Sequence, residues 1–73
     1  MNRDEVVENI GELVTMNGMG DLAMSPEYRK YIGDKEGKFS LRILKLTRGG
    51  MVHLEDTTNG VIHSVPPKNV DLL

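Results

Sequence analysis

The sequence predicts a mainly β fold: a small barrel of five short strands, closed or half-closed, with a short N-terminal helix and one long loop. Three observations lead to this prediction. Several runs with a strand-like pattern follow residue 11, and turn residues separate them. The pair Asn59-Gly60 stands between two such runs, which is the strongest local signal of a β-hairpin. Residues 17–38 show no strong strand pattern and predict a single long loop.

The N-terminus predicts a helix from about Arg3 to Ile10. Asn2 and Glu5 have the spacing of a capping box. Val6 and Ile10 would then share one face, and Gly11 favours a stop. We therefore divide the chain into this helix, residues 1–10, and a β domain, residues 11–73.

The first strand is predicted in GELVTM, residues 11–16. Within the loop that follows, Ser25-Pro26-Glu27 is a helix-start signal, and the turn that it begins would carry YRKYI and end at Gly33. In FSLRILKLT, Phe39, Leu41 and Ile43 share a face, after which Leu44 and Leu46 take over the apolar role. This change of phase predicts a β-bulge between Ile43 and Leu44. Arg48-Gly49-Gly50 predicts a turn, and NVDLL a closing strand after Pro66-Pro67.

The register of the predicted hairpin decides where the two histidines point. A two-residue loop pairs Asp56 with His63, whereas a four-residue loop, residues 57–60, pairs Leu54 with His63. In both registers His53 and His63 point to opposite faces. The apolar side chains that share a buried face would be Val52, Leu54, Val61 and Val65. We therefore expect His63 near the core and His53 outside.

A three-residue loop is the alternative, and it would place His53, Glu55 and His63 on one face. Two histidines and a carboxylate can bind a divalent metal. That register separates Leu54 from Val61 and Val65, however. Burial of each such side chain is worth about 1.5–3 kcal/mol, so the even-length loops are favoured. We expect neither a metal nor another cofactor.

Composition argues against several other classes of protein. The 73 residues include no cysteine, which excludes thiolate metal sites and Cys nucleophiles. Serines and threonines have no recognisable partners for a catalytic triad, and the glycine pairs lack a phosphate-binding pattern. We therefore expect no enzyme activity. The acidic N-terminus is no secretory signal, and no apolar run nears the roughly 18 residues of a membrane span, so we expect a cytoplasmic protein.

Charge is unevenly distributed along the chain. The net charge is −2, but residues 1–28 carry −5 and residues 29–48 carry +5. Such runs are often only solvated faces. Bases beside tyrosines, however, can bind phosphate and stack bases, or meet an acidic protein surface. The candidate macromolecule-binding residues are Tyr28, Arg29, Lys30, Tyr31, Lys35, Lys38, Arg42, Lys45 and Arg48. The rival acidic surface consists of Asp4, Glu5, Glu8 and Glu12. The alternative for both tyrosines is a place in the small core.

The stretch YIGDKEGKFSLRILKLTRGGMVHLED resembles a KOW-type motif, in which a basic glycine loop leads into a strand, a glycine turn and a second strand that ends in an acid. The matching residues are Gly33, Lys35, Gly37, Lys38, Ile43, Leu44, Gly49, Gly50, Val52, Leu54 and Glu55. GELV and SVPPKNVDLL are similar to the opening and the close of SH3-like barrels. The resemblance covers residues 11–73 and implies an SH3-like barrel.

KOW-like and SH3-like modules are binding domains of ribosomal proteins and of transcription elongation and antitermination factors, where some contact RNA and others RNA polymerase. The small size and the Met-rich loops also resemble phage-encoded proteins that redirect host RNA polymerase. A groove for proline-rich peptides is not expected, because the chain has no Trp.

We therefore predict a monomeric, non-enzymatic protein that regulates transcription, with an RNA polymerase subunit or a transcription factor as its partner. Two alternatives stay open at this point. One is an RNA-binding KOW-like module, and the other is a small structural or assembly protein of a phage or a complex.

Overall fold

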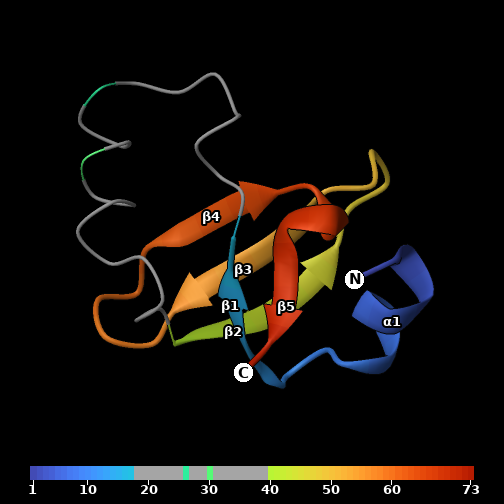
Figure 1. The fold of residues 1–73 in the computed structure, drawn as a ribbon, viewed down its shortest axis with the longest axis horizontal. Helices are drawn as coiled ribbons and strands as arrows, with labels where there is room; N and C mark the ends of the chain where they lie inside the picture. The colour runs from blue at the N-terminus through green and yellow to red at the C-terminus, as the bar shows by residue number, and fades with distance from the viewer. Residues whose placement is uncertain (18–25, 27–29, 31–39) are drawn as a thin grey trace.

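The computed structural model describes residues 1–17, 26, 30 and 40–73, which form one antiparallel sheet and one short helix (Figure 1). The sheet has five strands in the order β4-β3-β2-β1-β5. The elements are α1 (Arg3–Glu8), β1 (Leu13–Met16), β2 (Leu41–Leu46), β3 (Val52–Asp56), β4 (Ile62–Val65), a 3-10 turn (Pro67–Asn69) and β5 (Val70–Leu72). The predicted mainly β class, with five strands and an N-terminal helix, is confirmed.

The sheet is not closed in the part of the chain that the structure describes. β4 pairs with β3 and β5 pairs with β1, which makes these two strands the edges. Figure 1 shows β1 and β5 running steeply across the direction of β2–β4, as in a strongly twisted sheet. A closed barrel therefore stays a prediction.

Helix α1 begins as the sequence predicts but ends earlier. Both bonds of the capping box are present: Glu5 N–H donates to Asn2 Oδ1 (2.8 Å), and Asn2 N–H donates to Glu5 Oε1 (3.1 Å). The helix ends at Glu8, so Ile10 lies beyond it and is 48% exposed, while Val6 is fully buried. The predicted helix end at Ile10 was wrong, and Val6 and Ile10 do not share a helix face because the helix stops before it reaches Ile10.

The predicted bulge in β2 is confirmed. The register with β3 shifts between Ile43 and Lys45, so Leu44 is the extra residue. Leu41 and Ile43 are buried, and Leu46 packs partly against the core. Leu44 was expected in an apolar role beside Leu46, but it is 37% exposed. A bulge adds one residue without a cross-strand partner, and here that residue stays on the solvent side.

The β3–β4 hairpin has the four-residue loop, with Leu54 opposite His63 and Val52 opposite Val65. Asp56 N–H donates to Val61 O (2.8 Å), and Gly60 N–H donates back to Asp56 O (2.8 Å). Val61 was expected on the buried face but is 45% exposed. Val61 precedes β4 and lies beyond the last strand pair, Glu55–Ile62, where its carbonyl accepts from Asp56 N–H while its side chain faces solvent.

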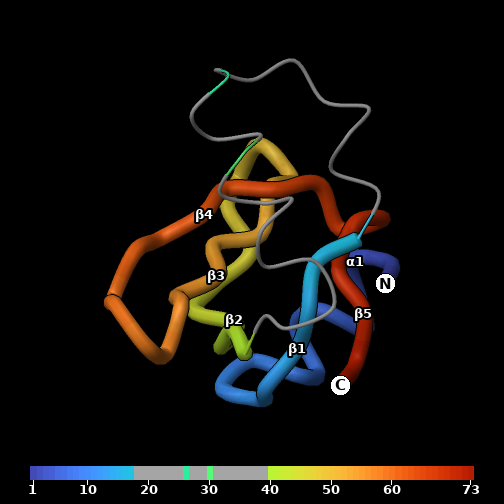
Figure 2. Tube along the Cα trace, turned by 60° about the vertical axis from the view of Figure 1, so that its left-hand side comes forward, coloured from blue at the N-terminus to red at the C-terminus, as the bar shows by residue number. Residues whose placement is uncertain are grey.

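The core is formed by inward-facing residues of all five strands and by Val6 of α1. Its buried apolar residues are Val6, Val14, Met16, Leu41, Ile43, Val52, Leu54, Val65 and Val70. The ammonium of Met1 donates to Pro67 O (3.0 Å) and Val70 O (2.8 Å), which ties the start of the chain to its last turn and strand. Figure 2 shows this arrangement, with the N-terminus and α1 beside β5. The helix is thus part of the same packed unit as the sheet.

Candidate macromolecule-binding surface

The sheet has an outer face, formed by the side chains that alternate with the core residues. Residues that pair directly across strands point to the same side. One row of such pairs runs Leu13–Arg42–Glu55–Ile62 across β1, β2, β3 and β4. A second row runs Lys45–His53–Ser64. We call these residues, with Leu44 of the bulge, the outer face.

Three of the predicted binding residues lie on the outer face or in the turn beside it. Arg42 and Lys45 are exposed on β2, and Arg48 is exposed in the turn to β3. Arg42 Nη1 donates to Gly11 O at 2.6 Å. This bond places the guanidinium beside the link between α1 and β1.

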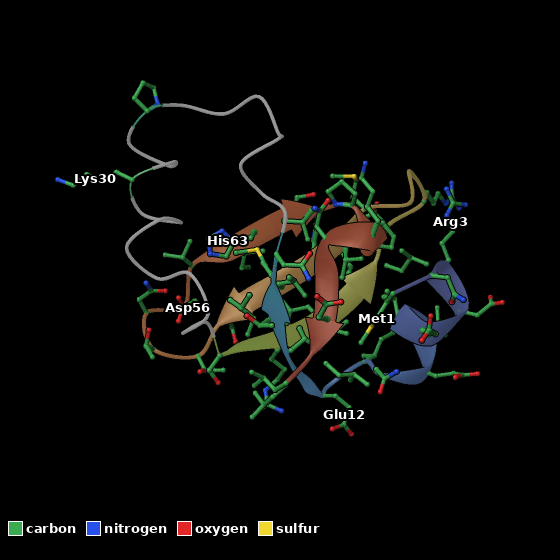
Figure 3. The ribbon with its side chains drawn as sticks, viewed as in Figure 1. Met1, Arg3, Glu12, Lys30, Asp56 and His63 are labelled. Atoms are coloured by element: carbon green, nitrogen blue, oxygen red, sulfur yellow. The ribbon has the colours of Figure 1, made fainter. Side chains whose placement is uncertain are left out.

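Of the remaining predicted basic and aromatic residues, the structure describes Lys30 alone. Lys30 is exposed and helical, as is Pro26 at the predicted helix start. Figure 3 places Lys30 at the opposite end of the molecule from Arg3. The Arg3 guanidinium lies against Gly50, so it marks the β2–β3 turn that contains Arg48. Lys30 is therefore apart from Arg48. The predictions that lie outside the described residues are Tyr28, Arg29, Tyr31, Lys35, Lys38, Phe39 and the rest of the helical turn.

The rival acidic surface lies on α1 and on the link to β1. Asp4, Glu5, Glu8 and Glu12 are all exposed. Glu5 is occupied by the capping box, so its carboxylate has a structural role. The other three carboxylates project from the helix and the link (Figure 3 labels Glu12). They are not part of the outer face.

The two histidines lie on opposite sides of the sheet, as the four-residue loop requires. His63 is buried, at 2% exposure, and lies on the core side opposite Leu54. His53 is half-buried on the outer face. The register with a three-residue loop, which would gather His53, Glu55 and His63, is not the one observed. Within the described residues, no group of three His, Asp or Glu side chains could bind a metal ion.

Two features of the structure were not predicted from the sequence. Asp56 is buried at 2% exposure, and its Oδ1 accepts from Thr58 N–H (2.9 Å) and Thr58 Oγ1 (2.6 Å). The signal was present, because an Asp side chain at the start of a turn commonly accepts from the backbone N–H two residues on. The second feature is a set of exposed aliphatic side chains on the outer face. Leu13, Leu44 and Ile62 are 40%, 37% and 56% exposed there.

No protein-family model, curated protein or solved structure matches this chain. The described ranges also contain no helix with the length and apolar character needed to cross a membrane.

Proposed function

We propose that this chain is a non-catalytic binding module that regulates transcription by contacting RNA polymerase or an associated factor through the outer face of its sheet. One observation supports the contact surface. Arg42, Lys45 and Arg48 follow one another along β2 and its turn, and all three are exposed. Beside them on this face, Glu55 is a half-buried acid that lies opposite Arg42. Within the described residues, none of these three cations forms an ion pair with an acid.

Two features favour a protein partner over bare RNA. Single-stranded RNA is bound by aromatic side chains on which bases stack, but the exposed uncharged side chains of the described outer face are mainly aliphatic. The chain also carries a net charge of −2, which opposes general attraction to a polyanion. An acidic patch on a protein satisfies both features, because it supplies complementary charge and apolar contacts together.

The class of partner follows from the resemblance to KOW-type modules. The matching residues that the structure describes lie on β2, β3 and the turn between them: Ile43, Leu44, Gly49, Gly50, Val52, Leu54 and Glu55. The exposed cations lie on these same elements. If the chain works as KOW-type modules do, its transcription partner would therefore bind at the exposed cations of β2 and the β2–β3 turn.

An affinity pull-down from lysate of the source organism or its host tests this proposal. The tag belongs at the C-terminus, because Leu73 is 68% exposed whereas the Met1 ammonium is bonded within the fold. Wild type should recover an RNA polymerase subunit or a transcription factor, and the double variant Lys45→Glu/Arg48→Glu should lose it. Lys68→Glu, a charge reversal in the 3-10 turn, is the matched control and should retain it. Recovery of no transcription protein by wild type would refute the proposal.

RNA binding is tested separately by titrating RNA oligonucleotides while the amide resonances are followed. If RNA binds, affinity should fall steeply with salt and should be lost in Lys45→Glu. Salt-dependent RNA binding, together with a pull-down that recovers no transcription protein, would identify RNA rather than a protein as the partner. Unchanged amide resonances would exclude RNA.

A further inference from the structure

The bulge in β2 places two neighbouring side chains on the solvent side of the sheet. Ile43 pairs with Leu54 and Lys45 pairs with His53, so Leu44 has no β3 partner of its own. In an unbroken strand successive side chains alternate between the faces, yet Leu44 and Lys45 are both exposed. Bulges commonly re-aim a side chain in this way. Here the result is a leucine next to a cation.

A second leucine lies close by on the same face. Leu13 of β1 is directly opposite Arg42, and Arg42 is two residues before Leu44 on β2. Adjacent strands are about 4.8 Å apart, so the two leucines and two cations occupy one small area over β1 and β2. We name this area, Leu13, Arg42, Leu44 and Lys45, the leucine–cation patch.

From the proposed function we infer that the leucine–cation patch binds an acidic amphipathic helix of the protein partner. Leucine side chains of that helix would cover Leu13 and Leu44, and its flanking carboxylates would meet Arg42 and Lys45. The position of the patch excludes an added strand. β1 and β2 are interior strands, with neighbours on both sides, so their main-chain groups are already paired and a further strand could join only at an edge.

The chemistry of the patch separates this occupant from others. A phosphate backbone would use the cations but would gain nothing from two exposed leucines. A helix with one apolar face and acidic flanks uses both. A helix is about 10–12 Å wide with its side chains, which matches the span of two to three strands. Arg42 also donates a hydrogen bond to Gly11 O, which restricts its side chain before binding.

A second copy of this chain is the competing occupant. Its α1 also combines acids with an exposed apolar residue, Val7, at 54% exposure. The helix has only six residues, however, and its Glu5 is used by the capping box. It offers less than two turns of binding surface, so we expect the partner helix to bind more tightly than a second copy does.

The test is fluorescence anisotropy with a labelled synthetic peptide of about 14 residues, close to four helical turns, with leucines on one face and glutamates on both flanks. Wild type should bind this peptide, and Leu44→Ser should weaken binding by roughly tenfold or more. Lys45→Glu should weaken it similarly. Two matched controls should bind as wild type does: Val61→Ser, an exposed apolar residue outside the patch, and Lys68→Glu, an exposed cation outside it.

Deletion of Leu44 is a sharper variant, because it removes the bulge while leaving the pairs Ile43–Leu54 and Lys45–His53 available in an unbroken ladder. We expect binding to fall as it does in Leu44→Ser. If the deletion variant does not fold, Leu44→Ser, which keeps the backbone intact, still decides the question.

Several outcomes would overturn the inference. These are no binding by wild type at about 1 mM peptide, equal binding of a peptide with lysines in place of the glutamates, or full affinity in Leu44→Ser. A sedimentation profile that shows dimers, lost in Leu44→Ser, would assign the patch to a second copy instead. The pull-down separates the two proposals. Recovery of a transcription protein by both wild type and Leu44→Ser would refute this inference alone, whereas peptide binding with an empty pull-down would refute the proposed function alone.

Discussion

The two faces of β2 and β3 show how one pair of strands serves two purposes. On the inner face, Leu41, Ile43, Val52 and Leu54 are all at most 1% exposed. On the outer face, Arg42 and Lys45 are exposed, and His53 and Glu55 are half-buried. The inner face therefore leaves little room for a change of volume, because packed cores respond to single methylene groups. The outer face is constrained mainly by charge and by the bulge, which leaves it available for binding.

The largest difference between the faces should appear on truncation of an aliphatic side chain. Leu54→Ala removes a fully buried side chain from β3, an interior strand of the sheet, and should lower the free energy of unfolding by about 2–5 kcal/mol. Ile62→Ala, on the outer face and 56% exposed, should lower it by less than about 1 kcal/mol. Urea denaturation followed by circular dichroism measures both. Equal losses would mean that Ile62 is buried in solution and that the two faces are not distinct.

A polar residue on the inner side gives the next largest effect. Asp56→Ala removes the acceptor of Thr58 N–H and Thr58 Oγ1, and we expect a loss of about 1–3 kcal/mol. Its neighbour Glu55 is on the outer face, and Glu55→Ala should stay within about 0.5 kcal/mol of wild type. Asp56→Asn keeps an acceptor oxygen and should recover part of the loss. The same urea titration measures all three variants, and an unchanged midpoint for Asp56→Ala would show that the loop holds without this carboxylate.

The fold was predictable where the signal is local or periodic. Asn2 and Glu5 stand at capping-box spacing, and their two bonds formed as expected. The change of apolar phase in β2 indicated the bulge. Burial of Val52, Leu54 and Val65 chose between loop lengths and so oriented both histidines. In each case residues close in sequence or across one hairpin carry the information.

The predictions of side-chain burial were wrong at the ends of helices and strands and at the bulge. Ile10, Leu44 and Val61 were each expected on an apolar face, and each is exposed at a helix end, a bulge or a strand end. Periodicity gives the face of a residue only while the element continues. The candidate surface was predictable in part: Arg42, Lys45 and Arg48 follow from strand β2 and its turn. The position of Lys30 did not follow, because residues 17–38 have no periodic pattern from which to place it.

Substitutions in the turn that joins β2 to β3 should change the free energy of unfolding by a smaller amount. Gly49 and Gly50, which are adjacent in this turn, can be compared directly. Gly50 has φ +83°, and a Cβ on it would overlap the Arg3 guanidinium. Gly50→Ala should lower the free energy of unfolding by about 1–2 kcal/mol, the usual penalty of a left-handed conformation for a residue with a Cβ. Gly49→Ala has no such conformation and no close contact, so its change should be slight. Thermal denaturation compares the two.

The double variant Arg3→Ala/Gly50→Ala divides that loss between its two causes. If the backbone conformation dominates, the double variant should be no more stable than Gly50→Ala. A recovery to the stability of Arg3→Ala alone would show instead that the overlap with the guanidinium was responsible.

The smallest effect on stability should come from the outer-face cation on which the proposed contact depends. Lys45 is exposed, and within the described residues it forms no ion pair with an acid, so Lys45→Glu should change the free energy of unfolding by no more than about 0.5 kcal/mol. The same variant is expected to lose the partner in the pull-down. A residue of a contact surface should affect binding without affecting the stability of the fold. If urea denaturation of Lys45→Glu showed a loss above about 1 kcal/mol, Lys45 would also contribute to folding, and its failure to bind would no longer support the outer face as the binding surface.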